Sequence, residues 1–118
     1  MQTRTLKAGL VTAALAVGFV AGAPNAARAA DAAAGEKVYA AQKCSMCHSV
    51  AGKGGKSSPL DGVGSKLTAE QLKEWIVDPI TAAKSHSSTK KPPMPKKYDK
   101  LPAADIDNLV AYMASLKK

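Results

Sequence analysis

The chain has 118 residues, the length of one small domain, and it contains no internal repeat and no second domain. It carries 17 basic and nine acidic residues, while aromatic residues make up only 4% of it. So small a chain buries only roughly 60–70% of its unfolded surface, and few large side chains are available to fill a core. A large apolar cofactor would make up for that shortage.

The first 29 residues are typical of a secretory signal peptide. Arg4 and Lys7 precede an uncharged run over residues 8–23, and residues 27–29 read Ala-Arg-Ala, a pattern that signal peptidases cleave. The 16 residues of this run are fewer than the roughly 20 that span a bilayer, so we expect no permanent membrane anchor. We predict a cleaved segment over 1–29, one domain over 30–118, and a periplasmic location.

The domain reads as helices separated by loops, without strand-like alternation. Asp31 can cap a first helix that runs to about residue 43. Residues 48–66 are rich in glycine, serine and lysine, which predicts a loop. Residues 68–71 form a capping box for the next helix, and Pro79 either stops that helix or opens a short successor.

The last helix has the clearest pattern. It follows a polar loop over 85–101 that contains three prolines. Pro102 stands at or beside the first helical position, and Asp105 and Asp107 are expected in the first turn. The apolar residues that recur at spacings of three and four are Ile106, Leu109, Val110, Met113 and Leu116. Together these elements predict an all-α fold.

Residues 42–50, QKCSMCHSV, contain both cysteines, Cys44 and Cys47, followed directly by His48. A disulfide across so short a loop would stabilise little. A thioredoxin-like dithiol follows a strand, whereas a helix is expected here. A zinc site would need His86 as a fourth ligand and would crowd adjacent residues around one ion. Two thioether bonds to haem vinyl groups need thiols one turn apart, so C-x-x-C-H in an exported chain favours covalent haem attachment.

With this motif, residues 31–118 resemble the class I c-type cytochromes. Gly35 and Tyr39 resemble the first helix of that family, in which the glycine permits close contact with the last helix. The resemblance implies a small cytochrome c fold, with three to five helices wrapped around the cofactor. It also implies one haem c per chain, bound covalently through Cys44 and Cys47.

The resemblance further implies how the haem is surrounded. His48 would be one axial ligand of the iron. The sequence SSPLDGVGSKL after the motif resembles a family loop in which the Pro59 carbonyl would accept a hydrogen bond from His48 and Leu60 would touch the ring. Ser58 stands where that loop usually has glycine. Trp75 is similar to the tryptophan that packs beside the haem propionates.

Met94 is the predicted second axial ligand. It lies between two prolines in a lysine-rich loop, where a methionine would otherwise be an exposed apolar residue, and PPMPKK resembles the methionine loop of the family. Met46 is inside the attachment turn, and Met113 falls on the apolar stripe of the last helix, where a core role is expected. His86 is the alternative ligand and would give a centre of lower potential. A vacant sixth position is the third alternative.

These features predict a soluble electron carrier rather than an enzyme. With both axial positions occupied, no substrate reaches the iron, and no nucleophile or acid–base pair is recognisable elsewhere. Methionine ligation raises the potential relative to a second histidine. The alternatives are a small haem peroxidase and the electron-accepting haem subunit of a periplasmic dehydrogenase.

The distribution of lysines along the chain predicts the kind of partner that the protein binds. Residues 79–98 contain five lysines and no acidic residue. We expect a monomer whose lysine-rich face docks on acidic surfaces of redox proteins, with a reductase or dehydrogenase as donor and an oxidase or reductase as acceptor. Nucleic acid is excluded as a partner by the predicted export and by the absence of arginine from residues 30–118. The lysines expected near the haem edge are Lys43, Lys53, Lys56, Lys84, Lys90, Lys91, Lys96 and Lys97.

Overall fold

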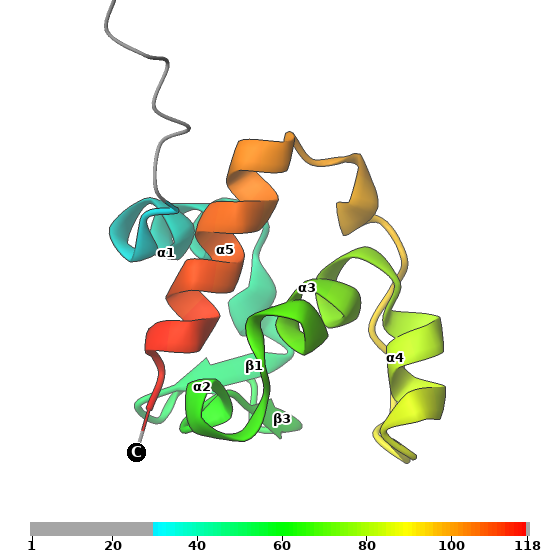
Figure 1. Ribbon diagram of the computed structural model, residues 1–118. Helices are drawn as coiled ribbons and strands as arrows, with labels where there is room; N and C mark the ends of the chain where they lie inside the picture. The colour runs from blue at the N-terminus through cyan, green and yellow to red at the C-terminus, as the bar shows by residue number, and fades with distance from the viewer. Residues whose placement is uncertain (1–29, 118) are drawn as a thin grey trace, which may run out of the picture.

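The computed structural model describes residues 30–117. The predicted signal peptide, over 1–29, and Lys118 lie outside the described residues. The prediction of a mainly helical fold is confirmed, with five α-helices and a small sheet (Figure 1). The elements in chain order are α1 (Ala32–Ala41), η1 (Cys44–Met46), β1 (His48–Val50), β2 (Lys53–Gly54), β3 (Ser58–Pro59), α2 (Val63–Lys66), α3 (Ala69–Val77), α4 (Pro79–Ser85), η2 (Tyr98–Lys100) and α5 (Ala103–Ser115).

The close contact between the first and last helices, expected at Gly35, is confirmed. In Figure 1, α1 lies against the middle part of α5. A Cβ atom at Gly35 would overlap the backbone carbonyl of Asn108, so only glycine allows this approach. The Asn108 side chain also accepts a hydrogen bond from the Asp31 backbone N–H at 2.9 Å. Beside the crossing, the rings of Tyr39 and Tyr112 pack edge to face, with centroids 5.5 Å apart.

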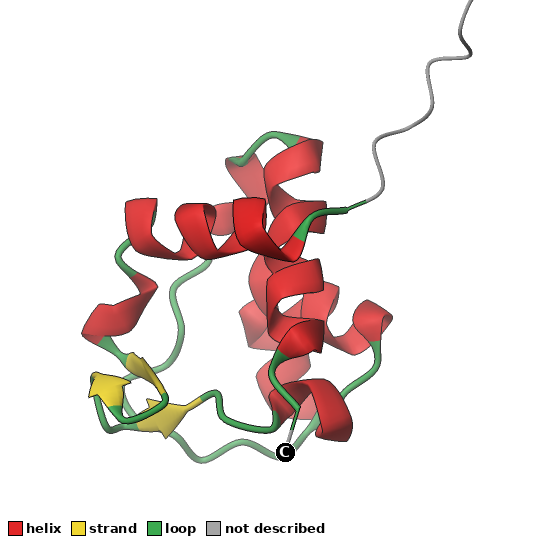
Figure 2. Ribbon diagram, turned by 90° about the vertical axis from the view of Figure 1, so that its left-hand side faces the viewer, coloured by secondary structure: helices red, strands yellow, loops and turns green. Residues whose placement is uncertain are grey.

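The prediction of a plain loop over 48–66 is wrong. This segment forms a three-stranded sheet in the order β2-β1-β3, followed by the short helix α2 (Figure 2). Ser49 pairs with Gly54 in the antiparallel half, and His48 pairs with Ser58 in the parallel half. Strands of two or three residues are too short to show alternation in a sequence, so their pairing appears only in the structure.

The helix ends follow the capping rules. The capping box at Thr68 and Gln71 is present and starts α3. Asp78 caps α4, and its carboxylate accepts a hydrogen bond from the Thr81 hydroxyl at 2.8 Å. Pro79 opens this successor helix as its first residue, which settles the choice that the sequence left open.

The start of α5 differs slightly from expectation. Pro102 is its N-cap and makes no side-chain cap hydrogen bond. Asp105 lies in the first turn, whereas the prediction that Asp107 does so is wrong, because α5 begins at Ala103. The Asp107 carboxylate instead pairs with Lys73 of α3 at 3.2 Å. This ion pair is exposed and therefore contributes little to stability.

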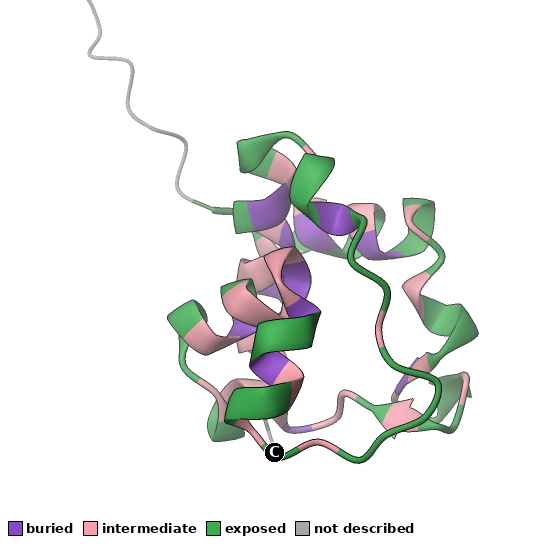
Figure 3. Ribbon diagram, turned by 90° about the vertical axis from the view of Figure 1, so that its right-hand side faces the viewer, coloured by how far each residue is buried: buried purple, intermediate pink, exposed green. Residues whose placement is uncertain are grey.

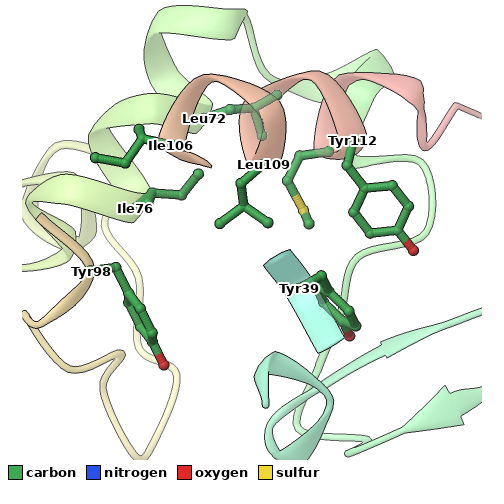
Figure 4. Packing of buried hydrophobic residues seen from close by; sticks show 8 residues of the cluster. Tyr39, Leu72, Ile76, Tyr98, Ile106, Leu109 and Tyr112 are labelled. Carbon is green, nitrogen blue, oxygen red and sulfur yellow. The ribbon is translucent and has the colours of Figure 1, made fainter. Parts of the chain in front are cut away.

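The core lies where α1, α3 and α5 meet. Figure 3 shows the buried residues gathered on these helices, while much of the segment between α4 and η2 is exposed. In Figure 4, Tyr39 and Tyr98 lie on opposite sides of the space beneath Leu109. Met113 belongs to this cluster, as its place on the apolar stripe predicted. The buried cluster consists of Tyr39, Leu72, Ile76, Tyr98, Ile106, Leu109, Tyr112 and Met113.

Candidate functional site

A cavity of about 550 Å³ opens beside this core. Its volume is within the range of roughly 300–1,000 Å³ that ligand pockets occupy. Several side chains of the core cluster form part of its wall, so the cavity borders the core directly. The apolar core residues in its lining are Leu72, Ile76, Leu109 and Met113.

Both cysteines line this cavity. After Lys43, which adopts a left-handed conformation at φ 55°, the chain turns into η1 and brings Cys44 and Cys47 to the cavity wall. Their sulfur atoms are not joined in a disulfide. Cys44 is half-buried, and this burial raises the pKa of its thiol, whereas Cys47 is exposed.

His48 also lines the cavity, and its ring is oriented by a hydrogen bond. Nδ1 donates to the backbone carbonyl of Ser58 at 2.9 Å. The prediction that the Pro59 carbonyl accepts this bond is therefore wrong. The cause is the strand register, which places Ser58 opposite His48 and Pro59 opposite Ser49. Because Nδ1 carries the proton, Nε2 is the ring nitrogen with a lone pair for a metal.

Tyr39 contacts the same histidine from α1. Its hydroxyl donates a hydrogen bond to the His48 backbone carbonyl at 3.2 Å. Burial, together with the nearby Cys44 and other groups, raises the pKa of Tyr39 to about 12. The hydroxyl therefore keeps its proton at neutral pH and acts as a donor. From the sequence, only a role in helix packing is expected for Tyr39, because a contact with a backbone carbonyl leaves no sequence signal.

Met94 lines the cavity as well, together with Pro93 and Pro95. The two prolines are exposed, whereas the methionine is half-buried and packs against the core. Met46 is 75% exposed and does not line the cavity. Met113 does line it, in addition to its core role. The structure therefore brings two methionines to the cavity, one from the proline-rich segment and one from α5.

Trp75 and His86 form an aromatic pair in the cavity wall. Their rings are stacked, with centroids 5.8 Å apart and planes at 25°. His86 ends α4, and its backbone N–H donates to the Ala82 carbonyl. The expected residues Leu60 and Pro59 also line the cavity. Among residues 30–117, no three side chains of the His, Cys, Asp and Glu types lie close enough together to hold a metal ion, so the four residues of the zinc alternative form no such group.

Positive charge surrounds the cavity. Four lysines line it, while no acidic residue does: Lys43, Lys66, Lys90 and Lys91. Two other lysines of the predicted face do not line the cavity and contact other side chains. Lys96 lies 3.9 Å from the carboxylate of Asp78, and the Lys97 ammonium lies 5.3 Å from the centre of the Tyr98 ring. The pairing of Lys96 leaves no signal in the sequence, because Asp78 lies outside the acid-free segment 79–98.

These residues fit a haem c. A porphyrin is a broad apolar ring, and the cavity offers apolar core side chains along its wall. Two thiols, an imidazole with its free Nε2 and a thioether share that wall, which is a donor set suited to covalent attachment and iron ligation. Cys44, Cys47, His48 and Met94 would hold the group.

Comparison with known proteins agrees with this site. None of the helices described between residues 30 and 117 is long and apolar enough to cross a bilayer. Searches of curated proteins and of solved structures gave no significant match. A family model described as Cytochrome c matches residues 32–117, a stretch that includes the C-x-x-C-H motif and Met94. With a match over most of its length and the matching donor set in one cavity, the chain belongs to the cytochrome c family.

Proposed function

We propose that this protein is a periplasmic one-electron carrier with a single haem c ligated by His48 and Met94. The observation that carries the proposal is the single cavity lined by Cys44, Cys47, His48 and Met94. A haem c supplies reversible one-electron chemistry at iron. The cysteines fix the group covalently, and the core side chains exclude water from it. The protein carries electrons and catalyses no reaction of its own.

Each ligand has a distinct part. The hydrogen bond from Nδ1 to the Ser58 carbonyl makes the His48 imidazole a stronger donor. The thioether of Met94 is a weaker donor, which raises the potential compared with a second imidazole. His86 stacks on Trp75 in the same wall, so it is the nearest alternative to test.

Optical spectroscopy of the ferric protein tests the ligation. Met94→Ala should remove the weak far-red band of an iron–sulfur bond, lower the potential and open the iron to cyanide. Met113→Leu is the matched control, since it removes the other sulfur that lines the cavity. This nearly volume-conserving change should keep the band and cost under about 1.5 kcal/mol. An unchanged spectrum for Met94→Ala would contradict the assignment and favour His86, and a wild type that binds cyanide as tightly as Met94→Ala would favour a peroxidase.

We further propose that the lysines at the cavity dock the protein on acidic partners. Lys43, Lys66, Lys90 and Lys91 line the cavity without an acidic neighbour in its lining. Such a face steers an oppositely charged partner toward the site of electron exchange. Because exposed charges are screened over about 8 Å at physiological ionic strength, association should slow as salt is added.

Stopped-flow electron transfer to an acidic redox protein tests this docking face. Lys90→Glu/Lys91→Glu should slow association strongly at low salt and flatten its salt dependence. Lys37→Glu/Lys117→Glu changes the net charge equally at exposed lysines that do not line the cavity, so it should have a much smaller effect. Equal effects of the two pairs would mean that only net charge matters.

The proposed location rests on the predicted signal peptide. Mass spectrometry of the protein from a periplasmic extract should show a haem-bearing chain that begins at residue 30, or up to three residues later. A haem-bearing chain that keeps residues 1–29 in the membrane fraction would contradict both the cleavage and the location.

A further inference from the structure

The histidine at the cavity is held by contacts of two kinds. Its ring is oriented by the Ser58 carbonyl, and its backbone belongs to β1, which pairs with β2 and β3. These partners all come from the twelve-residue stretch 48–59. The hydrogen bond from the Tyr39 hydroxyl to the His48 carbonyl comes instead from α1, nine positions away in the chain. It joins the helical part of the protein to the turn that carries the histidine.

Tyr39 is itself fixed on several sides. It is 8% exposed, and its ring packs edge to face on Tyr112 of α5. The crossing of α1 and α5 beside it is closed so tightly that Gly35 has no room for a Cβ atom. A side chain held in this way has already lost its rotamer freedom, so its hydroxyl can fix the position of the group to which it hydrogen-bonds.

The geometry is also specific for the hydroxyl. Only the oxygen of Tyr39 reaches the His48 carbonyl, while the ring packs against Tyr112 and lines the cavity. Phenylalanine at this position would keep the packing and lose the hydrogen bond. Tyr112 offers the matching comparison, because no hydrogen bond to its hydroxyl is formed within residues 30–117.

We propose that the Tyr39 hydroxyl is a positioning residue for the iron ligand, because it fixes the His48 peptide and so the direction of the imidazole. This inference rests on the proposed role of His48. Without the tether, the turn shifts and the bond from Nδ1 to the Ser58 carbonyl loosens. A looser bond makes the imidazole a weaker donor, which disfavours ferric iron. The potential therefore rises when the hydroxyl is removed.

The test compares Tyr39→Phe with Tyr112→Phe in the haem-loaded protein. Each variant removes one hydroxyl and keeps both rings. We expect Tyr39→Phe to shift the midpoint potential upward and to change the ferric electron paramagnetic resonance g-values, which report ligand orientation. Tyr112→Phe should leave both quantities as in the wild type. The same shift in both variants, or none in Tyr39→Phe, would overturn the proposal.

Two further measurements keep the outcome decisive. The far-red sulfur band of the wild type tests the proposed Met94 ligation separately, so a protein that keeps the band but shows no Tyr39→Phe effect refutes only the positioning role. If Tyr39→Phe fails to load haem, proton exchange in the wild type replaces the comparison. The Tyr39 hydroxyl proton should then exchange more slowly with solvent than that of Tyr112. Equal exchange rates would overturn the proposal.

Discussion

The two segments that carry the proposed iron ligands are held in place by different means. Residues 44–60 are tied by hydrogen bonds: Gly55 N–H donates to the Ser45 carbonyl at 2.7 Å, and Leu60 N–H donates to the Ser49 carbonyl at 2.9 Å. The ring nitrogen and the carbonyl of His48 add two more. Many weak bonds of this kind, each worth about 1 kcal/mol net, fix the position of the histidine.

The segment 91–97, which carries Met94, forms no such network. Among the described residues, none of its backbone groups makes a hydrogen bond to another part of the protein. Three of its seven residues are prolines, which lack the N–H group and restrict the backbone. Within residues 30–117, its one ion pair is that between Lys96 and Asp78. The histidine is thus held by bonds in the folded state, and the methionine by the limited freedom of its own chain.

The largest effect should come from removing the cofactor that both segments enclose. Cys44→Ala/Cys47→Ala, secreted without haem, should lose the cooperative thermal transition, because the core side chains then line an unfilled cavity. Calorimetry with circular dichroism measures this. The control is Met46→Ala, which changes a residue of the same turn that is 75% exposed. This variant should keep the cooperative thermal transition. A sharp transition in the double variant would mean that the protein builds a core without haem.

The next largest effect concerns the helix crossing behind the histidine segment. Gly35→Ala should destabilise the loaded protein by at least the roughly 1–3 kcal/mol typical of overpacking, since the new methyl group meets the backbone of Asn108. Alanine is the better helix former by about 1 kcal/mol, so any net loss reflects the crossing. Ala33→Ser adds one atom at an exposed position of α1 and should change the free energy of unfolding by under about 0.5 kcal/mol. Denaturant unfolding separates the two.

A smaller effect should appear on the methionine side. Pro95→Ala relaxes the backbone beside Met94, and a lost proline restriction is worth about 0.4–1 kcal/mol. Cyanide, which competes with the methionine for iron, should then bind about two- to fivefold more tightly. Pro102→Ala removes a proline at the start of α5, outside the cavity lining, and should leave cyanide affinity unchanged. Equal affinities in all three proteins would show that prolines do not hold this segment.

The smallest effect should be the pH dependence of Asp78. Its hydrogen bonds with Thr81, and to a lesser degree the charge of Lys96, lower the pKa of this carboxyl in the folded protein. Its contribution is therefore full above the unfolded pKa of about 3.9 and is lost as the pH falls through the lower folded value. Asp78→Asn should melt slightly below the wild type at neutral pH, and the difference should vanish in strong acid. If the difference in melting temperature persisted in strong acid, helix capping alone and not the carboxylate charge would account for it.

Much of this architecture could be predicted from local patterns. The capping box before α3, the proline start of α4 and the apolar stripe of α5 are rules that act within a few residues. The glycine at the helix crossing was expected from the family resemblance, and the structure supplies its cause in the Asn108 carbonyl. The residues predicted to contact the haem all line one cavity. They could be predicted because the C-x-x-C-H spacing and the methionine loop are local sequence signals.

What could not be predicted depends on register and on distant pairs. The acceptor for the His48 ring is Ser58 and not Pro59, a difference of one position that the pairing of two short strands decides. The stacking of His86 on Trp75 places in the cavity wall a residue of the predicted polar loop over 85–101. The ion pair of Lys96 likewise depends on how the segment folds back toward α4. None of these contacts has a sequence pattern of its own.

The pairing of α1 with α5 also bears on how the chain folds. The hydrogen bond between Asp31 and Asn108 joins positions 77 apart, so it closes nearly the whole domain. Contacts of such long sequence separation carry a large loop-closure entropy cost, which slows folding. A chain that is synthesised from its N-terminus presents Cys44 and Cys47 before α5 exists. At that stage the Cys44 thiol, which is half-buried in the folded protein, is still open to haem attachment.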